Sequence, residues 1–272
     1  MHESPLPLEG ISAVILDMDG VLYRGDRVIR GAPGAVEWLR KNGKKLVFTT
    51  NNSASTRAGY ARKLTRIGIP AHESEIVTSG YATAVYLRKR CPDAKIYVVG
   101  EDGLRAELKL AGLKLVSGKE AREATHVVVG IDRKINYSGI SSALFALLAG
   151  AEFIATNTDS TYPTEVGLYP GAGAMVGALA GCSGRWPSLV VGKPYPHMIK
   201  IALETIGARP RETLMIGDRI DTDVMAGKIM GIRTVLVLSG VCGEEDVRKV
   251  RNTDMAPDFV LKSIADVVNW GS

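Results

Sequence analysis

The chain has 272 residues, 46% of them hydrophobic and 23% charged, a balance typical of globular proteins that excludes a disordered or fibrous chain. The formal net charge is +5, but the lysines and arginines are scattered, so the charge favours small anionic substrates over a nucleic-acid polymer. No apolar run is long enough to cross a membrane, no leader-like segment begins the chain, and Cys91, Cys182 and Cys242 form no C-x-x-C pair, so we expect a cytoplasmic protein with free thiols.

The first fifty residues predict one strand–helix–strand unit. A short apolar run over 11–16 ends in Asp17, and a second run over 45–50 ends in Thr-Asn-Asn. Between them, residues 32–41 have the spacing of an amphipathic helix, and Gly43 follows as a stop signal.

The same alternation continues to the end of the chain. A helix is expected from residue 56 to about residue 67, and a second helix over 196–206. Further strands are expected over 188–191, 213–216 and 234–238. Strands that alternate with helices predict a parallel sheet covered on both faces, which is the doubly wound α/β class.

The middle of the chain repeats this pattern with strands of its own, expected over 95–99, 126–129 and 152–155. It is long enough to form a second domain and lies between the strands that carry the candidate site. We therefore expect a doubly wound core formed by residues 1–80 and 182–272, interrupted by an inserted α/β cap domain over residues 81–181.

The first predicted strand ends in Leu16-Asp17-Met18-Asp19-Gly20, which places two carboxylates one residue apart. Ligands of open α/β sheets bind beyond the carboxyl ends of strands, and alternate residues of an extended segment point the same way. Both carboxylates can then face one pocket, where their repulsion favours a divalent cation. The alternative is an Asp-rich turn closed by Gly20, and this motif alone does not decide between the two.

Two more polar motifs follow predicted strands. Thr50-Asn51-Asn52 offers a hydroxyl and open backbone donors of the kind that hold a phosphoryl oxygen. Gly192-Lys193-Pro194 supplies an ammonium that would neutralise the Asp17 carboxylate and substrate oxygens. Taken singly, each has an ordinary alternative, which is a helix-capping loop for the first and a surface lysine in a turn for the second.

The predicted strand over 213–216 is followed by Gly217 and a segment with three acids, Asp218, Asp221 and Asp223. Short Asp side chains suit Mg²⁺, which demands compact oxygen ligation and keeps several waters. A helix N-terminus also attracts acids, and this explains at least one of the three.

Together, and in this order, the four motifs resemble those of the haloacid dehalogenase (HAD) superfamily, namely Asp-x-Asp, a Thr or Ser, a Lys and a Gly-Asp acidic motif. The resemblance narrows to the subgroup of NagD, pyridoxal phosphatase and the 4-nitrophenylphosphatases, which carry a large α/β cap. This narrower likeness rests on residues 49–53, 129–134 with Tyr137, 155–159 and 169–173. It implies a Mg²⁺-dependent phosphatase acting on a small phosphate ester such as a nucleotide, sugar phosphate, phosphoglycolate or aryl phosphate.

The resemblance also implies the catalytic roles. Asp17 is expected to be the nucleophile that forms an aspartyl-phosphate, and Asp19 the general acid and base. The charge on the transferred phosphoryl group is expected to be stabilised by Thr50, Lys193 and the backbone amides near Met18 and Asn51.

For the metal, the resemblance implies ligation by the side chains of Asp17 and Asp218 and by the backbone carbonyl of Asp19. Asp223 is expected to orient a metal-bound water. Asp221 matches no ligand position of the family and is given no role.

The cap is expected to cover the site and to recognise the leaving group. Candidates for substrate contact are Asn157, Asp159, Tyr162 and Glu165. Tyr162 stands before Pro163 where pyridoxal phosphatase has a histidine, which argues against pyridoxal phosphate as the substrate. Relatives often pair through their caps, so a homodimer is a further expectation.

Three other functions are considered. A dinucleotide site is suggested by Gly171, Gly173 and Gly177, but Pro170 precedes them and the third glycine comes one residue too late for G-x-G-x-x-G. A non-catalytic phospho-acceptor module is disfavoured by Asp19, because a general base there would hydrolyse the acyl phosphate. Transfer of the phosphoryl group to an acceptor other than water remains open.

Overall fold

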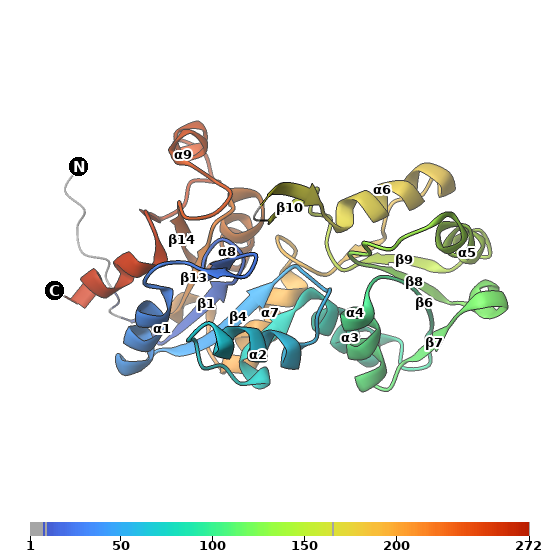
Figure 1. Ribbon diagram of the computed structural model, residues 1–272, viewed down its shortest axis with the longest axis horizontal. Coiled ribbons are helices and arrows are strands. Elements are labelled where there is room, and N and C mark those ends of the chain that lie inside the picture. Colours follow the sequence, from blue (N-terminus) through green and yellow to red (C-terminus); the bar gives the residue numbers. More distant parts are fainter. Residues whose placement is uncertain (1–7, 9, 165, 272) are drawn as a thin grey trace.

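The computed structural model describes residues 8, 10–164 and 166–271. Two parallel sheets lie next to each other along the long axis of the molecule, with helices on the faces of both (Figure 1). The first sheet contains the strands at whose ends Asp17, Thr50 and Asp218 lie. The second sheet is built from the middle of the chain. The expected α/β class with a doubly wound parallel sheet is confirmed.

The first sheet has six parallel strands in the order β15-β14-β13-β1-β4-β5. The chain winds outward from β1 in one direction and outward from β13 in the other, so the strand order reverses between β1 and β13. Ligands of such sheets bind at this reversal, beyond the carboxyl ends of the two strands. The strands are β1 (Ala13–Asp17), β4 (Lys45–Thr50), β5 (Ile76–Thr78), β13 (Thr213–Gly217), β14 (Arg233–Val237) and β15 (Phe259–Leu261).

The second sheet has five parallel strands in the order β12-β9-β8-β6-β7. They are β6 (Lys95–Val99), β7 (Lys114–Val116), β8 (His126–Val129), β9 (Glu152–Ala155) and β12 (Leu189–Val190). Two small antiparallel hairpins complete the strands: β2 (Tyr23–Arg24) with β3 (Arg27–Val28), and β10 (Thr161–Thr164) with β11 (Gly167–Pro170).

One predicted strand joins the other sheet. The apolar run over 188–191 was expected in the core sheet, but its strand β12 pairs with β9 of the second sheet. A run of three apolar residues after Ser188 has no local feature that selects its partner, because pairing is decided by distant parts of the chain. The loop that carries Lys193 therefore leaves the second sheet and not the first.

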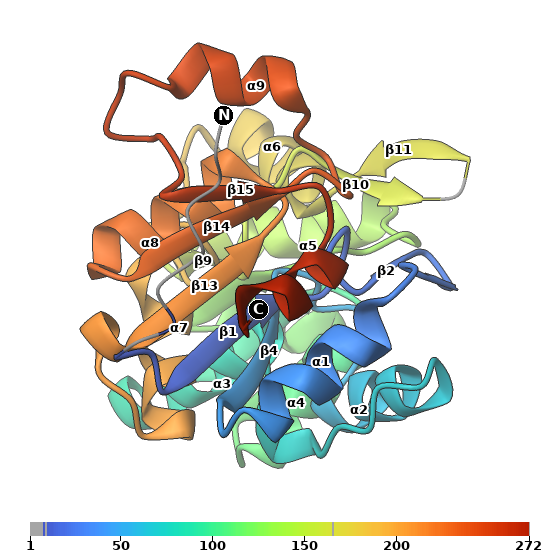
Figure 2. The same ribbon diagram turned by 90° about the vertical axis from the view of Figure 1, so that its left-hand side faces the viewer.

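Helices cover both faces of both sheets (Figures 1 and 2). On the first sheet, α1 and α2 pack against Val14 and Leu16 of β1, while α7 and α8 lie with Ala13 and Ile15 on the opposite face, as the period of two in a strand requires. The helices are α1 (Ala32–Lys41), α2 (Arg57–Arg66), α3 (Ser79–Arg90), α4 (Asp102–Leu110), α5 (Tyr137–Leu148), α6 (Ala172–Ser183), α7 (Pro196–Ile206), α8 (Met225–Met230) and α9 (Glu244–Val250). Short 3-10 turns occur at Glu73–Glu75, Gly118–Glu123, Pro210–Glu212 and Ile264–Gly271, and a π turn at Ile220–Val224.

A single hydrophobic cluster joins the two sheets. Ile15 and Val47 of the first sheet share it with Val128 and Ile154 of the second, and Leu87 of α3 belongs to the same cluster. The division into residues 1–80, 81–181 and 182–272 stays a prediction. The position expected for its first boundary lies inside α3, and β12 of the last segment belongs to the second sheet.

Among the described residues, no helix has both the length and the apolar character that a membrane span requires. Cys91, Cys182 and Cys242 are free cysteines.

Candidate active site

Three buried carboxylates meet where the strand order reverses. Asp17 is the last residue of β1, Asp218 directly follows β13, and Asp223 lies in the π turn after it. Each of the three offers an oxygen, and these oxygens lie within 4.8 Å of one another. The backbone brings them together because β1 and β13 are paired neighbours, so that their carboxyl ends lie side by side.

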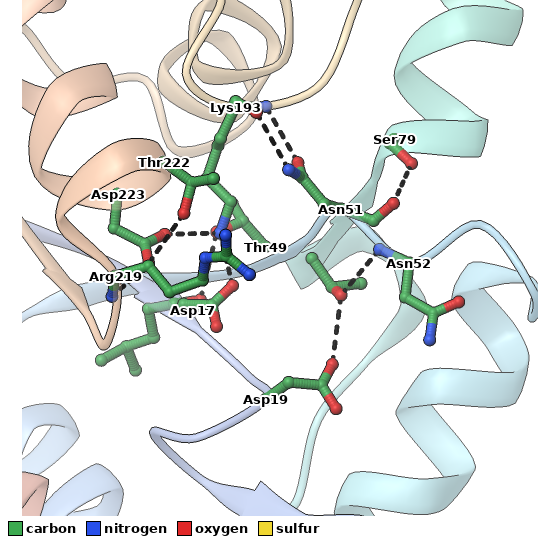
Figure 3. A network of polar contacts seen from close by, with 12 residues as sticks. Asp17, Asp19, Thr49, Asn51, Asn52, Ser79, Lys193, Arg219, Thr222 and Asp223 are labelled. Atoms are coloured by element: carbon green, nitrogen blue, oxygen red, sulfur yellow. Dashed lines mark hydrogen bonds and ion pairs between the residues drawn. The ribbon is translucent and has the colours of Figure 1, made fainter. Parts of the chain in front are cut away.

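The ammonium of Lys193 joins this cluster. It donates to the Asp17 carboxylate and to Oδ1 of Asp223, the latter at 2.6 Å, and its side chain is almost fully buried (Figure 3). Burial disfavours the charged form, but the carboxylates of Asp17 and Asp223 outweigh it and raise the pKa of Lys193 above its usual value. The lysine is therefore a cation held beside the Asp17 carboxylate.

One ammonium does not balance three carboxylates. Desolvation raises the pKa of Asp17 well above its usual value against the opposing effect of Lys193, and Asp223 and Asp218 add repulsion. Desolvation, with repulsion from Asp223 second, also raises the pKa of Asp218 to about 7. A divalent cation would offset this excess of negative charge and would let the carboxylates stay ionised.

The surroundings of Asp218 fit an ion-binding carboxylate. A Cβ on Gly20 would come within 2.2 Å of Asp218 Oδ2, and a Cβ on Gly240 within 1.9 Å, so only glycine permits the carboxylate to occupy this position. Gly20 also has a φ of 80°, which glycine adopts without strain. The amide of Val241 donates to Asp218 Oδ2 at 2.7 Å and fixes its orientation. The oxygen-rich donor set is of the kind that Mg²⁺ prefers.

Asp19 lies at the mouth of the same cluster. Its Oδ2 accepts a hydrogen bond from Thr50 Oγ1 at 3.3 Å, and the amide of Asn52 donates to the same hydroxyl at 3.0 Å. Desolvation raises the pKa of Asp19, partly opposed by the charge of Lys63. A raised pKa suits a carboxyl that must give and take a proton near neutral pH. The side chain of Met18 is fully buried and faces the core, which leaves only its backbone for ligands.

A pocket opens beside these groups. Residues of both sheets' loops line it: Asp17, Asp19, Thr50, Asn51, Asn52, Asp159, Thr161, Tyr162, Pro163, Lys193, Asp218, Arg219, Thr222, Asp223 and Val241. The structure thus brings the proposed core side chains together at one pocket. Met18, which was proposed for its backbone amide, lies between Asp17 and Asp19 with its side chain in the hydrophobic core.

The proposed substrate-contact residues differ in position. Asp159 and Tyr162 line the pocket, and desolvation raises the pKa of Asp159 to about 6. Asn157 is buried away from the pocket, and its side-chain amide donates to the Asn51 carbonyl at 2.6 Å. Glu165 lies outside the described residues. Asp221 has a largely exposed side chain and pairs with Arg219, in keeping with its having no assigned role.

Two residues of the site, Arg219 and Gly240, were not predicted from the sequence. Arg219 lines the pocket next to Asp218, donates to both Asp221 oxygens and reaches the Thr161 carbonyl of the β10–β11 hairpin at 3.4 Å. The position of Arg219 within the Gly-Asp-Arg motif is the one local feature that could have marked it. Gly240 lies 22 residues beyond Asp218 in a loop with no motif, so its contact is visible only in three dimensions.

Comparison with known proteins agrees with this geometry. The family model described as haloacid dehalogenase-like hydrolase matches residues 14–114, and a second, described as HAD-hydrolase-like, matches residues 190–267. Phosphoglycolate phosphatase 1A of Arabidopsis thaliana is 38% identical over 96% of this chain and 78% of its own length. The chain belongs to the haloacid dehalogenase-like hydrolases.

Further members of this family match over most of their length. The sugar-phosphatase AraL of Bacillus subtilis is 36% identical over 98% of this chain and 94% of its own. Among solved structures, a p-nitrophenyl phosphatase from Archaeoglobus fulgidus has 39% identity and a TM-score of 0.89, covering 95% of this chain and 98% of its own. NagD from E. coli has 35% identity and a TM-score of 0.84, covering 94% and 98%. This HAD-like hydrolase is accordingly a phosphatase, and the resemblance to the NagD and 4-nitrophenylphosphatase subgroup is confirmed.

Proposed function

We propose that this HAD-like phosphatase hydrolyses small phosphate monoesters through an aspartyl-phosphate on Asp17, with Mg²⁺ as its metal. The observation that carries the proposal is the buried contact of the Lys193 ammonium with Asp17, the carboxylate expected to attack. A lysine held there neutralises both the nucleophile and the incoming phosphoryl oxygens, which is what phosphoryl transfer needs most.

The first chemical step joins a carboxylate oxygen of Asp17 to phosphorus and breaks the bond between phosphorus and the ester oxygen. Lys193 and the Thr50 hydroxyl, with the backbone amides near Met18 and Asn51, stabilise the charge on the three equatorial oxygens. Asp19, protonated at this stage, gives its proton to the leaving oxygen, which departs as an alcohol.

The second step reverses these roles. Asp19, now ionised, takes a proton from a water that attacks the aspartyl-phosphate, so inorganic phosphate leaves and the Asp17 carboxylate is restored. The side chains of Asp17 and Asp218 and the Asp19 carbonyl would hold Mg²⁺, with Asp223 beside it, and the ion would supply charge stabilisation for both steps.

The substrate is a small phosphorylated metabolite. Relatives are named for phosphoglycolate, sugar phosphates, glycerol 3-phosphate and p-nitrophenyl phosphate. Asp159 and Tyr162 lie at the pocket and are our candidates for contact with the leaving group, as is Arg219. A panel of these esters and of nucleoside monophosphates, compared by kcat/KM, tests the choice.

The nucleophile is tested by Asp17→Asn with 4-nitrophenyl phosphate and Mg²⁺. We expect the variant to lose phosphate release by a factor of about 10³ or more, because an amide cannot form the acyl phosphate. Turnover retained by the variant would overturn the assignment.

Two alternative functions have their own tests. Product analysis with added alcohols or sugars detects transfer to another acceptor. A burst without turnover in the unaltered protein would favour a non-catalytic phospho-acceptor.

Two broader expectations are also proposals. A homodimer through the second sheet's helices is supported by apolar side chains exposed on α5, where Tyr137 is 86% and Leu148 68% exposed. Light scattering of the protein and of Leu148→Glu tests it, since a charge in the contact would give a monomer.

A cytoplasmic location is supported by the three free cysteines, which suit a reducing compartment.

A further inference from the structure

Lys193 reaches the first sheet from outside it. The strand before it, β12, is bonded to β9 of the second sheet, so no ladder of the first sheet fixes the lysine relative to Asp17. A lysine side chain has four rotatable bonds and an entropy that favours mobility. Something other than strand pairing must therefore hold the Lys193 backbone over the end of β1.

The side-chain amide of Asn51 makes that connection. Its Oδ1 accepts from the Lys193 backbone N at 2.9 Å, and its Nδ2 donates to the Lys193 backbone O at 2.9 Å (Figure 3). This pair of bonds replaces the bridge that a neighbouring strand would provide. Both are buried, so breaking them would leave the peptide groups of Lys193 unpaired away from water.

The amide is itself held firmly. The Asn51 carbonyl accepts from Ser79 Oγ at 2.5 Å and from Asn157 Nδ2 at 2.6 Å, so both ends of the residue are fixed. The segment before Lys193 lies so close that a Cβ on Gly192 would come within 2.7 Å of Asn51 Oδ1. Nδ2 of Asn51 also donates to Asp159 at 3.1 and 3.2 Å, which links the pocket-lining carboxylate to the same amide.

We infer that the Asn51 side chain is a positioning residue that places the Lys193 ammonium at the phosphoryl-acceptor carboxylate. The inference rests on the proposed function and adds to it a role distinct from that of the Asn51 backbone amide. An amide is required because the Lys193 peptide needs one acceptor and one donor, which neither a carboxylate nor a hydroxyl supplies in this geometry. Asn51 acts through Lys193 and touches no reacting atom with its side chain.

A double-mutant cycle between the two residues tests this. Asn51→Ala, Lys193→Ala and the double variant are compared by kcat for 4-nitrophenyl phosphate with saturating Mg²⁺. We expect Asn51→Ala to lower kcat by about 10–100-fold when Lys193 is present, because misplacement of about 1 Å costs that much. In the Lys193→Ala background, the same change should cost less than about threefold, since the residue to be positioned is gone. Equal factors in both backgrounds would overturn the inference.

Two further variants separate positioning from general damage. Tyr60→Phe removes a hydrogen bond to the neighbouring Asn52 carbonyl without touching Asn51 or Lys193, so its effect should be equal in both backgrounds. Asn51→Asp keeps the shape and one acceptor while losing the donor, and it serves if Asn51→Ala does not fold. Circular dichroism and melting temperature establish that each variant is folded. The proposed function has its own test in Asp17→Asn, so an additive cycle would refute the positioning role alone.

Discussion

The Asp218 carboxylate lies directly against Gly240, where a Cβ would come within 1.9 Å of Oδ2 and within 2.2 Å of the Asp218 Cβ. Because the clash reaches the base of the aspartate side chain and Val241 N holds its oxygen, the carboxylate cannot simply rotate away. We expect Gly240→Ala to displace Asp218 and to lower kcat/KM by about 10²-fold, with a higher Mg²⁺ concentration needed for half-maximal rate.

The matched control is Gly243→Ala, three residues further along the same loop. Gly243 has an ordinary φ of −115° and no atom within 4 Å of an added Cβ. Its substitution should leave both kcat/KM and the Mg²⁺ dependence unchanged. If Gly240→Ala needed the same Mg²⁺ concentration for half-maximal rate as the unaltered protein, the close contact with Gly240 would not determine the position of Asp218.

Metal-free protein should become less stable as the pH rises from about 4 to about 7. Desolvation first, and repulsion from Asp223 second, raise the pKa of Asp218 from 3.8 to about 7. Between these two values the native state binds more protons than the unfolded state, so the free energy of unfolding falls with increasing pH. A shift of this size corresponds to an upper limit on the order of a few kcal/mol.

Asp218→Asn tests this linkage by removing the buried charge while keeping the shape. In the presence of a chelator, its melting temperature should fall less between pH 4 and pH 7 and should exceed that of the unaltered protein at pH 8. Added Mg²⁺ should stabilise the unaltered protein more than the variant, because binding to the native state alone adds stability. Identical pH slopes for the two proteins would contradict the role given to Asp218.

Asp19→Asn should distinguish leaving groups. An alkoxide needs a proton as it departs, whereas 4-nitrophenolate leaves readily without one, so the loss should reach about 10²–10⁴-fold for glycerol or sugar phosphates and be smaller in the first step with the aryl ester. The second step also lacks its base, so the variant should release a burst of nitrophenolate followed by slow turnover. Stopped-flow absorbance measures both phases, and equal losses for alkyl and aryl esters would exclude Asp19 as the general acid.

The local elements could be predicted from the sequence because each depends on neighbouring residues. The bounds expected for α1, β4 and α7 agree with the structure, since helical periodicity with Gly43 or Gly207 after it, or a short apolar run, defines them. Three of the four motifs could be placed in one site because Asp17, Thr50 and Asp218 lie at the ends of strands of one parallel sheet, and such ends meet at one edge. Lys193 follows a strand of the second sheet, so its place in the site is seen only in the structure.

The remaining features depend on contacts between distant segments. The apolar run of β12 does not reveal that it pairs with β9, and the Asn51 side chain shows its partner only after the Lys193 loop is placed. In the sequence, Gly240 is an ordinary loop glycine, and only the structure shows that Asp218 lies against it. Sequence motifs thus indicate the polar groups of the candidate site, while the groups that position them are found from packing.

The junction between the two sheets should be sensitive to a single methyl group at Gly103 of α4. A Cβ there would come within 2.4 Å of Ser55 N and 2.5 Å of the Ala54 carbonyl, which are backbone atoms that cannot rotate aside. We expect Gly103→Ala to destabilise the protein by about 1–3 kcal/mol, as overpacking in a close interface does. Gly139→Ala in α5 is the control, because its nearest neighbour, Asn136 Oδ1, lies at an ordinary 3.6 Å. Since one hydrophobic cluster spans both sheets, urea denaturation should show a single transition that shifts to lower urea in Gly103→Ala and does not in Gly139→Ala. Two separate transitions in the unaltered protein would show that the sheets unfold independently and would contradict a shared core.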